Sequence, residues 1–153
     1  MKSTHLLHLL TICSLLMMHS CTTKSDITDS VPYQLADNYF FRNDAPDTTN
    51  PIICNTLEEF EQYYGYAAVM GKNGQPTPID FNKYTTIGIV LPVTNHETYI
   101  HPTDLLLYNA CLTLHYKLQT DEQELSFSLR PMILLIVDKE NVAKAKSFEI
   151  QQD

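Results

Sequence analysis

The sequence lacks tryptophan, lacks an apolar run long enough to span a bilayer, and is poor in positive charge. Ten Lys and Arg residues stand against 18 Asp and Glu residues, so the formal net charge is −8. Affinity for nucleic acid depends on Lys and Arg side chains that contact phosphates, so this balance argues against a nucleic-acid partner. Nine Tyr and six Phe residues supply the large apolar side chains that a core needs.

Motifs for cofactors, metals and catalysis are also lacking. The stretch GKNG at 71–74 does not have the spacing of a phosphate loop. His96 and His101 are five residues apart, so in a regular strand they face opposite ways and do not form a zinc pair. We therefore predict no cofactor, no metal and no catalytic residue, and hence a protein that is not an enzyme. A hydrolase that uses His115 or Cys111 is kept as a minor alternative.

The N-terminus has the pattern of a secretory signal. Lys2 gives a positive start, and residues 6–18 are almost wholly apolar. This apolar stretch is too short for a membrane span, which needs about 20 residues. We predict that residues 1–20 are a signal peptide that is removed after export.

The end of this signal resembles a bacterial lipobox, in which a lipidated cysteine becomes the first residue of the mature chain. Ser20 is the small residue before the predicted cleavage site, and Cys21 follows it. Met18 and His19 replace the leucine and the small residue that are usual there. The resemblance implies a membrane anchor through lipid on Cys21, in the bacterial cell envelope, on the outer membrane at its periplasmic face or surface. An ordinary secreted protein with a nearby cysteine remains the alternative.

Beyond the anchor, the sequence predicts a tether and one domain. Residues 21–30 are polar and lack aromatics, so they cannot bury enough surface to order themselves. Residues 31–153 are enough for a single domain with its own core. Cys54 and Cys111 lie in this domain and could pair outside the cytoplasm, which would stabilise the fold by on the order of 4 kcal/mol. Two buried thiols are the alternative.

The clearest local signal is a helix at about 56–64. Thr56 is expected to cap the N–H of Glu59, and the Glu59 side chain to reach back to the N–H of Thr56. Leu57, Phe60 and Tyr64 should form its apolar face, and Gly65 should end it.

Several segments read as strands, with a further short helical turn at 139–146. Residues 111–118 and 125–130 both alternate with period two and are predicted to form a hairpin through 119–124, with His115 opposite Ser128. Residues 132–138 are apolar throughout, as in a strand covered on both faces. The remaining strands are predicted at 38–44, 51–55, 85–92, 94–101 and 147–151. We predict an α+β fold: a small, mostly antiparallel twisted sheet or open barrel with one main helix.

A long connection between the helix and the strand at 85–92 is the candidate partner-binding loop. Its expected contact residues are Met70, Gly71, Lys72, Asn73 and Gly74. Long loops on rigid scaffolds commonly bind partners. The alternative is a crossover that packs Ala67, Val69 and Met70 into the core.

The segments YFFRND, LEEFEQYYGYAAVMGKNGQPTPIDFNKY, IGIVLPVTNHETYI, LTLHYKL and PMILLIVDK together resemble small lipoproteins of unknown function from Bacteroides-type bacteria. More loosely, EEFEQYY, PIDFNKYTTIGIVLP and PMILLIVDK are similar to the C-terminal domain of the protease-complex subunit PrcB. That similarity implies a lipoprotein that binds or stabilises an exported protease, and it carries over no catalytic residue. We therefore expect a non-catalytic binding module of the cell envelope that inhibits or stabilises an exported protease. The alternative is a structural or ligand-capturing accessory lipoprotein of an envelope complex.

Overall fold

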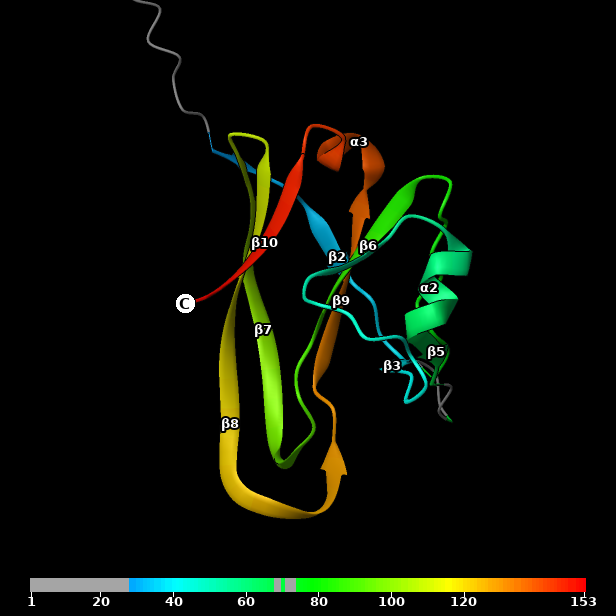
Figure 1. Ribbon diagram of the computed structural model, residues 1–153, viewed down its shortest axis with the longest axis vertical. Coiled ribbons are helices and arrows are strands. Elements are labelled where there is room, and N and C mark those ends of the chain that lie inside the picture. Colours follow the sequence, from blue (N-terminus) through cyan, green and yellow to red (C-terminus); the bar gives the residue numbers. More distant parts are fainter. Residues whose placement is uncertain (1–27, 68–69, 71–73) are drawn as a thin grey trace, which may run out of the picture.

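The computed structural model describes residues 28–67, 70 and 74–153, and these form three sheets and two short helices (Figure 1). The first sheet has the order β1 (Asp29–Ser30), β7 (Thr94–Tyr108), β8 (Cys111–Leu129), β10 (Ser147–Gln152). The second has the order β2 (Tyr33–Leu35), β9 (Met132–Asp138), β6 (Tyr84–Val90), β4 (Ile52–Cys54). A two-stranded sheet joins β3 (Tyr39–Phe41) to β5 (Tyr64–Tyr66), and the helices are α2 (Leu57–Tyr63) and α3 (Lys139–Val142). The predicted α+β class with mostly antiparallel pairing is confirmed, and the sheets do not close into a barrel.

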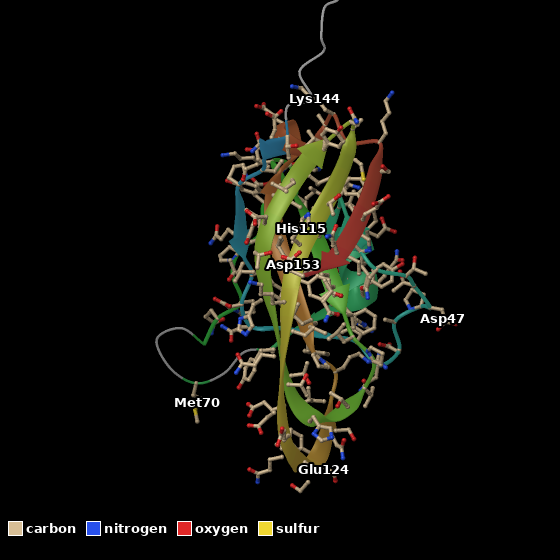
Figure 2. The ribbon with its side chains drawn as sticks, turned by 90° about the vertical axis from the view of Figure 1, so that its left-hand side faces the viewer. Asp47, Met70, His115, Glu124, Lys144 and Asp153 are labelled. Carbon is tan, nitrogen blue, oxygen red and sulfur yellow. The ribbon has the colours of Figure 1, made fainter. Side chains whose placement is uncertain are left out.

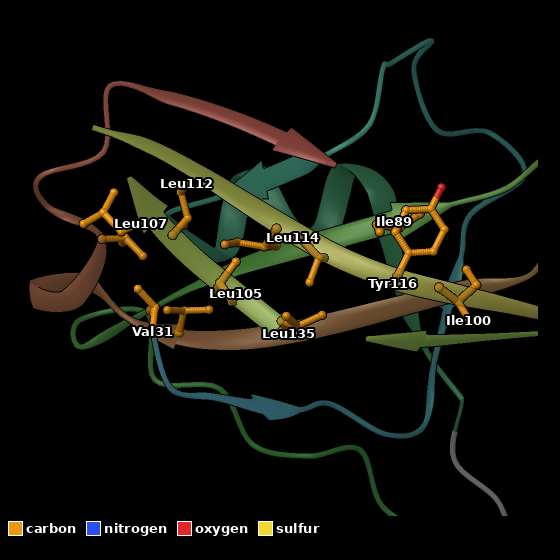
Figure 3. Close-up of a cluster of buried hydrophobic side chains, with 12 residues drawn as sticks. Val31, Ile89, Ile100, Leu105, Leu107, Leu112, Leu114, Tyr116 and Leu135 are labelled. Carbon is orange, nitrogen blue, oxygen red and sulfur yellow. The ribbon is translucent and has the colours of Figure 1, made fainter. Parts of the chain in front are cut away.

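The first core lies between the two four-stranded sheets (Figure 3). Leu112 and Leu114 of β8 pack in one cluster with Ile87 and Ile89 of β6. Each of these four side chains is at most 1% exposed. Alternation with period two places these residues on the inner faces of their sheets, as the sequence predicted.

A second core lies on the opposite face of the β2-β9-β6-β4 sheet. Leu134 of β9 and Cys54 of β4 pack there with Phe60 of α2 and with Tyr64. Its neighbour Leu135 belongs to the first core, so β9 is covered on both faces. This confirms the interpretation of the continuous apolar run at 132–138.

Helix α2 forms where its capping residues predict it, with three differences of detail. The Thr56 hydroxyl accepts a hydrogen bond from the N–H of Glu59 at 3.1 Å. The Glu59 carboxylate, however, accepts from the N–H of Asn55 at 2.6 Å and not from that of Thr56. Gly65 does not end the helix: it lies in β5, where a Cβ would come within 2.4 Å of the Phe40 ring. Leu57 is 48% exposed and is not part of the buried face.

The predicted hairpin at 111–130 is wrong, because residues 111–129 form one continuous strand, β8. The partner of β8 is β7, and the turn between them is at Asn109 and Ala110, both with positive φ. His115 therefore lies opposite Asp104 and not opposite Ser128. The expected strand at 94–101 is the first half of β7, and the last predicted strand, β10, runs parallel to β8.

Candidate binding surface

An aromatic cleft of about 400 Å³ opens beside α2. Its floor is the buried Phe60, whose ring meets Tyr39 edge to face at 5.2 Å between centroids. The ring of Tyr66 lies 5.7 Å from that of Tyr39. The lining residues are Tyr39, Leu57, Phe60, Tyr66, Pro76, Pro78, Ile79 and Phe81. The cleft, named the aromatic cleft below, thus joins the β3–β5 sheet, α2 and the segment that leads to β6.

The rim of the aromatic cleft presents apolar side chains to solvent. Leu57 is 48% exposed and Tyr66 is 54% exposed. The Tyr66 hydroxyl donates to the carboxylate of Glu61 at 3.4 Å, so a negative charge stands at the rim. Burial, followed by the charge of Glu61, raises the pKa of Tyr66 above its usual value. A partner that enters here would meet an apolar wall with a carboxylate beside it.

The candidate loop starts and ends beside this cleft. The N–H of Ala67 donates to the carbonyl of Asn38 at 2.9 Å. At the other end, the N–H of Thr77 donates to the carbonyl of Asp37 at 3.1 Å, and the Tyr39 hydroxyl donates to the carbonyl of Thr77 at 2.6 Å. Both ends of the segment are therefore fixed to the same stretch of chain, next to the aromatic walls.

Met70 projects away from the body of the protein and is fully exposed (Figure 2). The alternative that packs Met70 into the core is therefore wrong for this residue. Gly74 is buried, so it supports the loop and does not offer a contact surface. Gly71, Lys72, Asn73 and Val69 lie outside the described residues, as do the predicted cleavage and lipidation residues Ser20 and Cys21.

His115 has a carboxylate partner that sequence reasoning missed. Its Nδ1 lies 2.9 Å from Asp153 Oδ1, and the Thr103 hydroxyl donates to Asp153 Oδ2 at 2.8 Å (Figure 2). The bond to His115, followed by that from Thr103, lowers the pKa of the Asp153 carboxyl. Cys111 lies four residues from His115 on the same strand, about 13 Å away by the usual strand rise. The cysteine is therefore not a nucleophile for this pair.

The two cysteines of the domain are free thiols, so the disulfide considered from the sequence is not formed. Cys54 is fully buried in the second core on β4, where burial raises the pKa of its thiol to about 11. Cys111 begins β8 in a different sheet, with its sulfur 3.8 Å from the Thr113 hydroxyl.

Within 28–67, 70 and 74–153, no group of three or more His, Cys, Asp or Glu side chains is placed to hold a metal ion. No helix in the described part is long and apolar enough to cross a membrane. Comparison of the chain with protein-family models, curated proteins and solved structures found no match.

Proposed function

We propose that this chain is a cell-envelope lipoprotein, anchored by lipid on Cys21, that acts as a non-catalytic binding module for a protein partner. The observation that carries the proposal is the aromatic cleft, with Leu57 and Tyr66 half exposed at its rim and Met70 fully exposed in the loop whose ends lie beside it. Exposed aromatic and aliphatic side chains grouped around a cleft are the usual anchors of protein interfaces. The signal pattern of residues 1–21 supports the anchor and the location.

The sharper form of the proposal makes the partner an exported protease that the module inhibits or stabilises. Support for this form comes from the similarity of the sequence to PrcB-type domains. An accessory lipoprotein that captures another envelope protein or a ligand would use the same cleft. The identity of the captured molecule separates the two.

The test is a capture experiment with matched variants. The chain without residues 1–21 is immobilised and exposed to detergent extract and culture supernatant of the source organism. Wild type is compared with Leu57→Asp and Tyr66→Ser, which alter the rim of the cleft. The control is Phe127→Ser, which removes an equally exposed ring from β8 outside the cleft.

A protein that wild type and Phe127→Ser retain, and that both rim variants lose, supports the binding module. Circular dichroism verifies that the variants are folded. Capture that is equal for all four chains, or absent from all, contradicts the use of the aromatic cleft. If the captured protein is a protease, its activity with and without the module distinguishes inhibition from stabilisation.

A hydrolase built on His115 is the second candidate, because the Asp153 carboxylate holds the imidazole in a fixed orientation. Its test is hydrolysis of ester and peptide substrates. If the wild type hydrolyses a substrate and His115→Ala abolishes this turnover, the hydrolase replaces the binding proposal. If the wild type shows no turnover, this candidate is removed.

A further inference from the structure

A second cleft, of about 430 Å³, lies between the 45–50 segment and the ends of β6 and β8. Phe41, Ile52 and Val90 give it apolar walls, and Arg130 stands among its lining residues. Asp47 of this cleft and Met70 project from opposite sides of the protein (Figure 2). The cleft, named the Arg130 cleft below, therefore belongs to a surface separate from the candidate loop.

The guanidinium of Arg130 is oriented but not neutralised. Its Cζ lies 5.3 Å from the centroid of the Phe41 ring, which holds the planar group over the aromatic face. No acid of the described residues forms an ion pair with Arg130, and its side chain lies at the exposed edge of the cleft. Its hydrogen-bond donors are therefore available to a ligand.

Arg42 shows the contrast within the same chain. The sequence has only these two arginines. Arg42 Nε donates to Asp44 Oδ1 at 3.0 Å and its Nη2 donates to Asp44 Oδ2 at 2.8 Å. Arg42 is thus bound to a carboxylate by two parallel hydrogen bonds, the geometry that guanidinium and carboxylate prefer, whereas Arg130 has no such partner among the described residues.

We propose that the Arg130 cleft binds the terminal carboxylate of an extended apolar peptide. The guanidinium of Arg130 matches a carboxylate with two parallel hydrogen bonds, and the apolar walls would take the last side chain of the peptide. Ile52 belongs to β4, the edge strand of its sheet. A strand at the edge of a sheet can pair with an extended backbone, which favours a peptide over a compact anion.

Asp47 provides a second test of the proposal. Its carboxylate also lines the cleft and would repel an incoming carboxylate. Asp47→Asn should therefore strengthen binding, in the direction opposite to the effect of losing Arg130. If the cleft bound peptides by apolar contact alone, neither the loss of Arg130 nor Asp47→Asn should change the affinity.

The experiment is an NMR titration of the chain without residues 1–21, followed through the Nε–H signals of its two arginines. The probe is acetyl-alanyl-valyl-leucine with a free carboxylate, for which a cleft of this kind predicts a Kd of roughly millimolar. The same peptide as its C-terminal amide and sodium acetate are titrated in parallel. We expect the free-acid peptide to shift the Arg130 signal and to leave that of Arg42 in place, with little effect from the amide or from acetate.

Variants complete the test. Arg130→Gln should weaken binding of the free-acid peptide at least about tenfold, Arg130→Lys should weaken it less, and Arg42→Gln should leave it unchanged. The proposal is overturned if the amide binds as well as the acid, if acetate alone produces the same shift, or if Arg130→Gln has no effect. No shift of the Arg130 signal at saturating peptide also overturns it. None of these results bears on the aromatic cleft.

Discussion

At the scale of single residues, the Tyr64 side chain fills the space that a side chain at Gly88 would need. A Cβ at Gly88 would lie 2.0 Å from the Tyr64 hydroxyl oxygen. That hydroxyl is buried without a hydrogen-bond partner among the described residues, and burial raises its pKa well above the usual range. The Tyr64 side chain is thus the close neighbour that leaves room only for glycine at position 88.

Gly88→Ala should lower the free energy of unfolding by about 1–3 kcal/mol, because the new methyl group has no room. Tyr64→Phe alone should be close to neutral, since the hydroxyl it removes has no partner. In the double variant the methyl group gains the space of the hydroxyl, so part of the loss should be recovered. Urea unfolding of the four chains measures this cycle. Strictly additive effects would show that the two positions are not in contact.

The second prediction concerns Asp153 and the dependence of stability on pH. Its pKa is lowered in the folded state from an ordinary value of 3.8, by the bonds to His115 and Thr103. A lowered carboxyl pKa contributes stability above the unfolded value, and this contribution is lost as the pH falls through the folded value. The stability advantage of wild type over Asp153→Asn should therefore be constant well above pH 3.8 and shrink as the pH falls through and below 3.8. Urea midpoints across this range give the difference.

Thr103→Val serves as the comparison, because it removes the hydrogen bond with the smaller effect on the pKa of Asp153 and leaves His115 in place. It should lose less stability than Asp153→Asn and keep part of the decline below pH 3.8. An advantage of wild type over Asp153→Asn that persists unchanged into acid would contradict a role for the carboxylate charge.

At the scale of elements, the turn between β7 and β8 carries local strain. Asn109 and Ala110 have φ values of 48° and 63°, as a two-residue turn of type I′ requires. Asn tolerates this region, whereas the Cβ of Ala is crowded there. The carbonyl of Ala110 also accepts the N–H of Lys146 at 2.7 Å, so the turn holds the start of β10.

Ala110→Gly should therefore raise the free energy of unfolding by about 1 kcal/mol. The matched control is Ala143→Gly at the end of α3, where φ is −58° and the substitution relieves no strain. That control should be neutral or destabilising. Thermal and urea unfolding measure both. Equal effects at the two alanines would mean that the backbone of the turn is not the cause.

The same turn explains what the sequence could not predict. Residues 119–124 are polar and look like a turn, but they lie in the exposed half of β8, where no face needs apolar side chains. The true turn has Ala where Gly is usual, so its chemical signal is weak. By contrast, the cap at Thr56 and the apolar run at 132–138 carry their information locally, and both predictions are confirmed.

The candidate surfaces could not be predicted from the sequence for a related reason. The aromatic cleft brings together Tyr39 of β3, Tyr66 of β5 and Phe81 of the segment before β6. The pair of His115 and Asp153 depends on the parallel pairing of β10 with β8, which no local pattern specifies. Only the position of the loop before β6 could be read directly from the sequence.

At the scale of the whole molecule, the two cores are separated by a single sheet and share its strands. Leu134 and Leu135 are neighbours in β9, yet Leu134 packs toward α2 and Leu135 packs toward β7 and β8. Both are at most 1% exposed. Because β9 and β6 belong to both cores, loss of either core should remove support from the other.

This arrangement predicts one cooperative unfolding transition for the whole domain. Leu134→Ala and Leu135→Ala should each lower the free energy of unfolding by about 2–5 kcal/mol, because each leaves a cavity in a packed core. Tyrosine fluorescence reports on both sides of the sheet, because Tyr39, Tyr63 and Tyr64 cluster beside α2 whereas Tyr33 and Tyr116 pack in the first core. Far-UV circular dichroism reports on all the strands. In each variant the two signals should shift to the same urea midpoint. If the fluorescence midpoint fell at a lower urea concentration than the circular dichroism midpoint in Leu134→Ala alone, the layer with α2 would unfold by itself. The aromatic cleft would then belong to a separate unfolding unit.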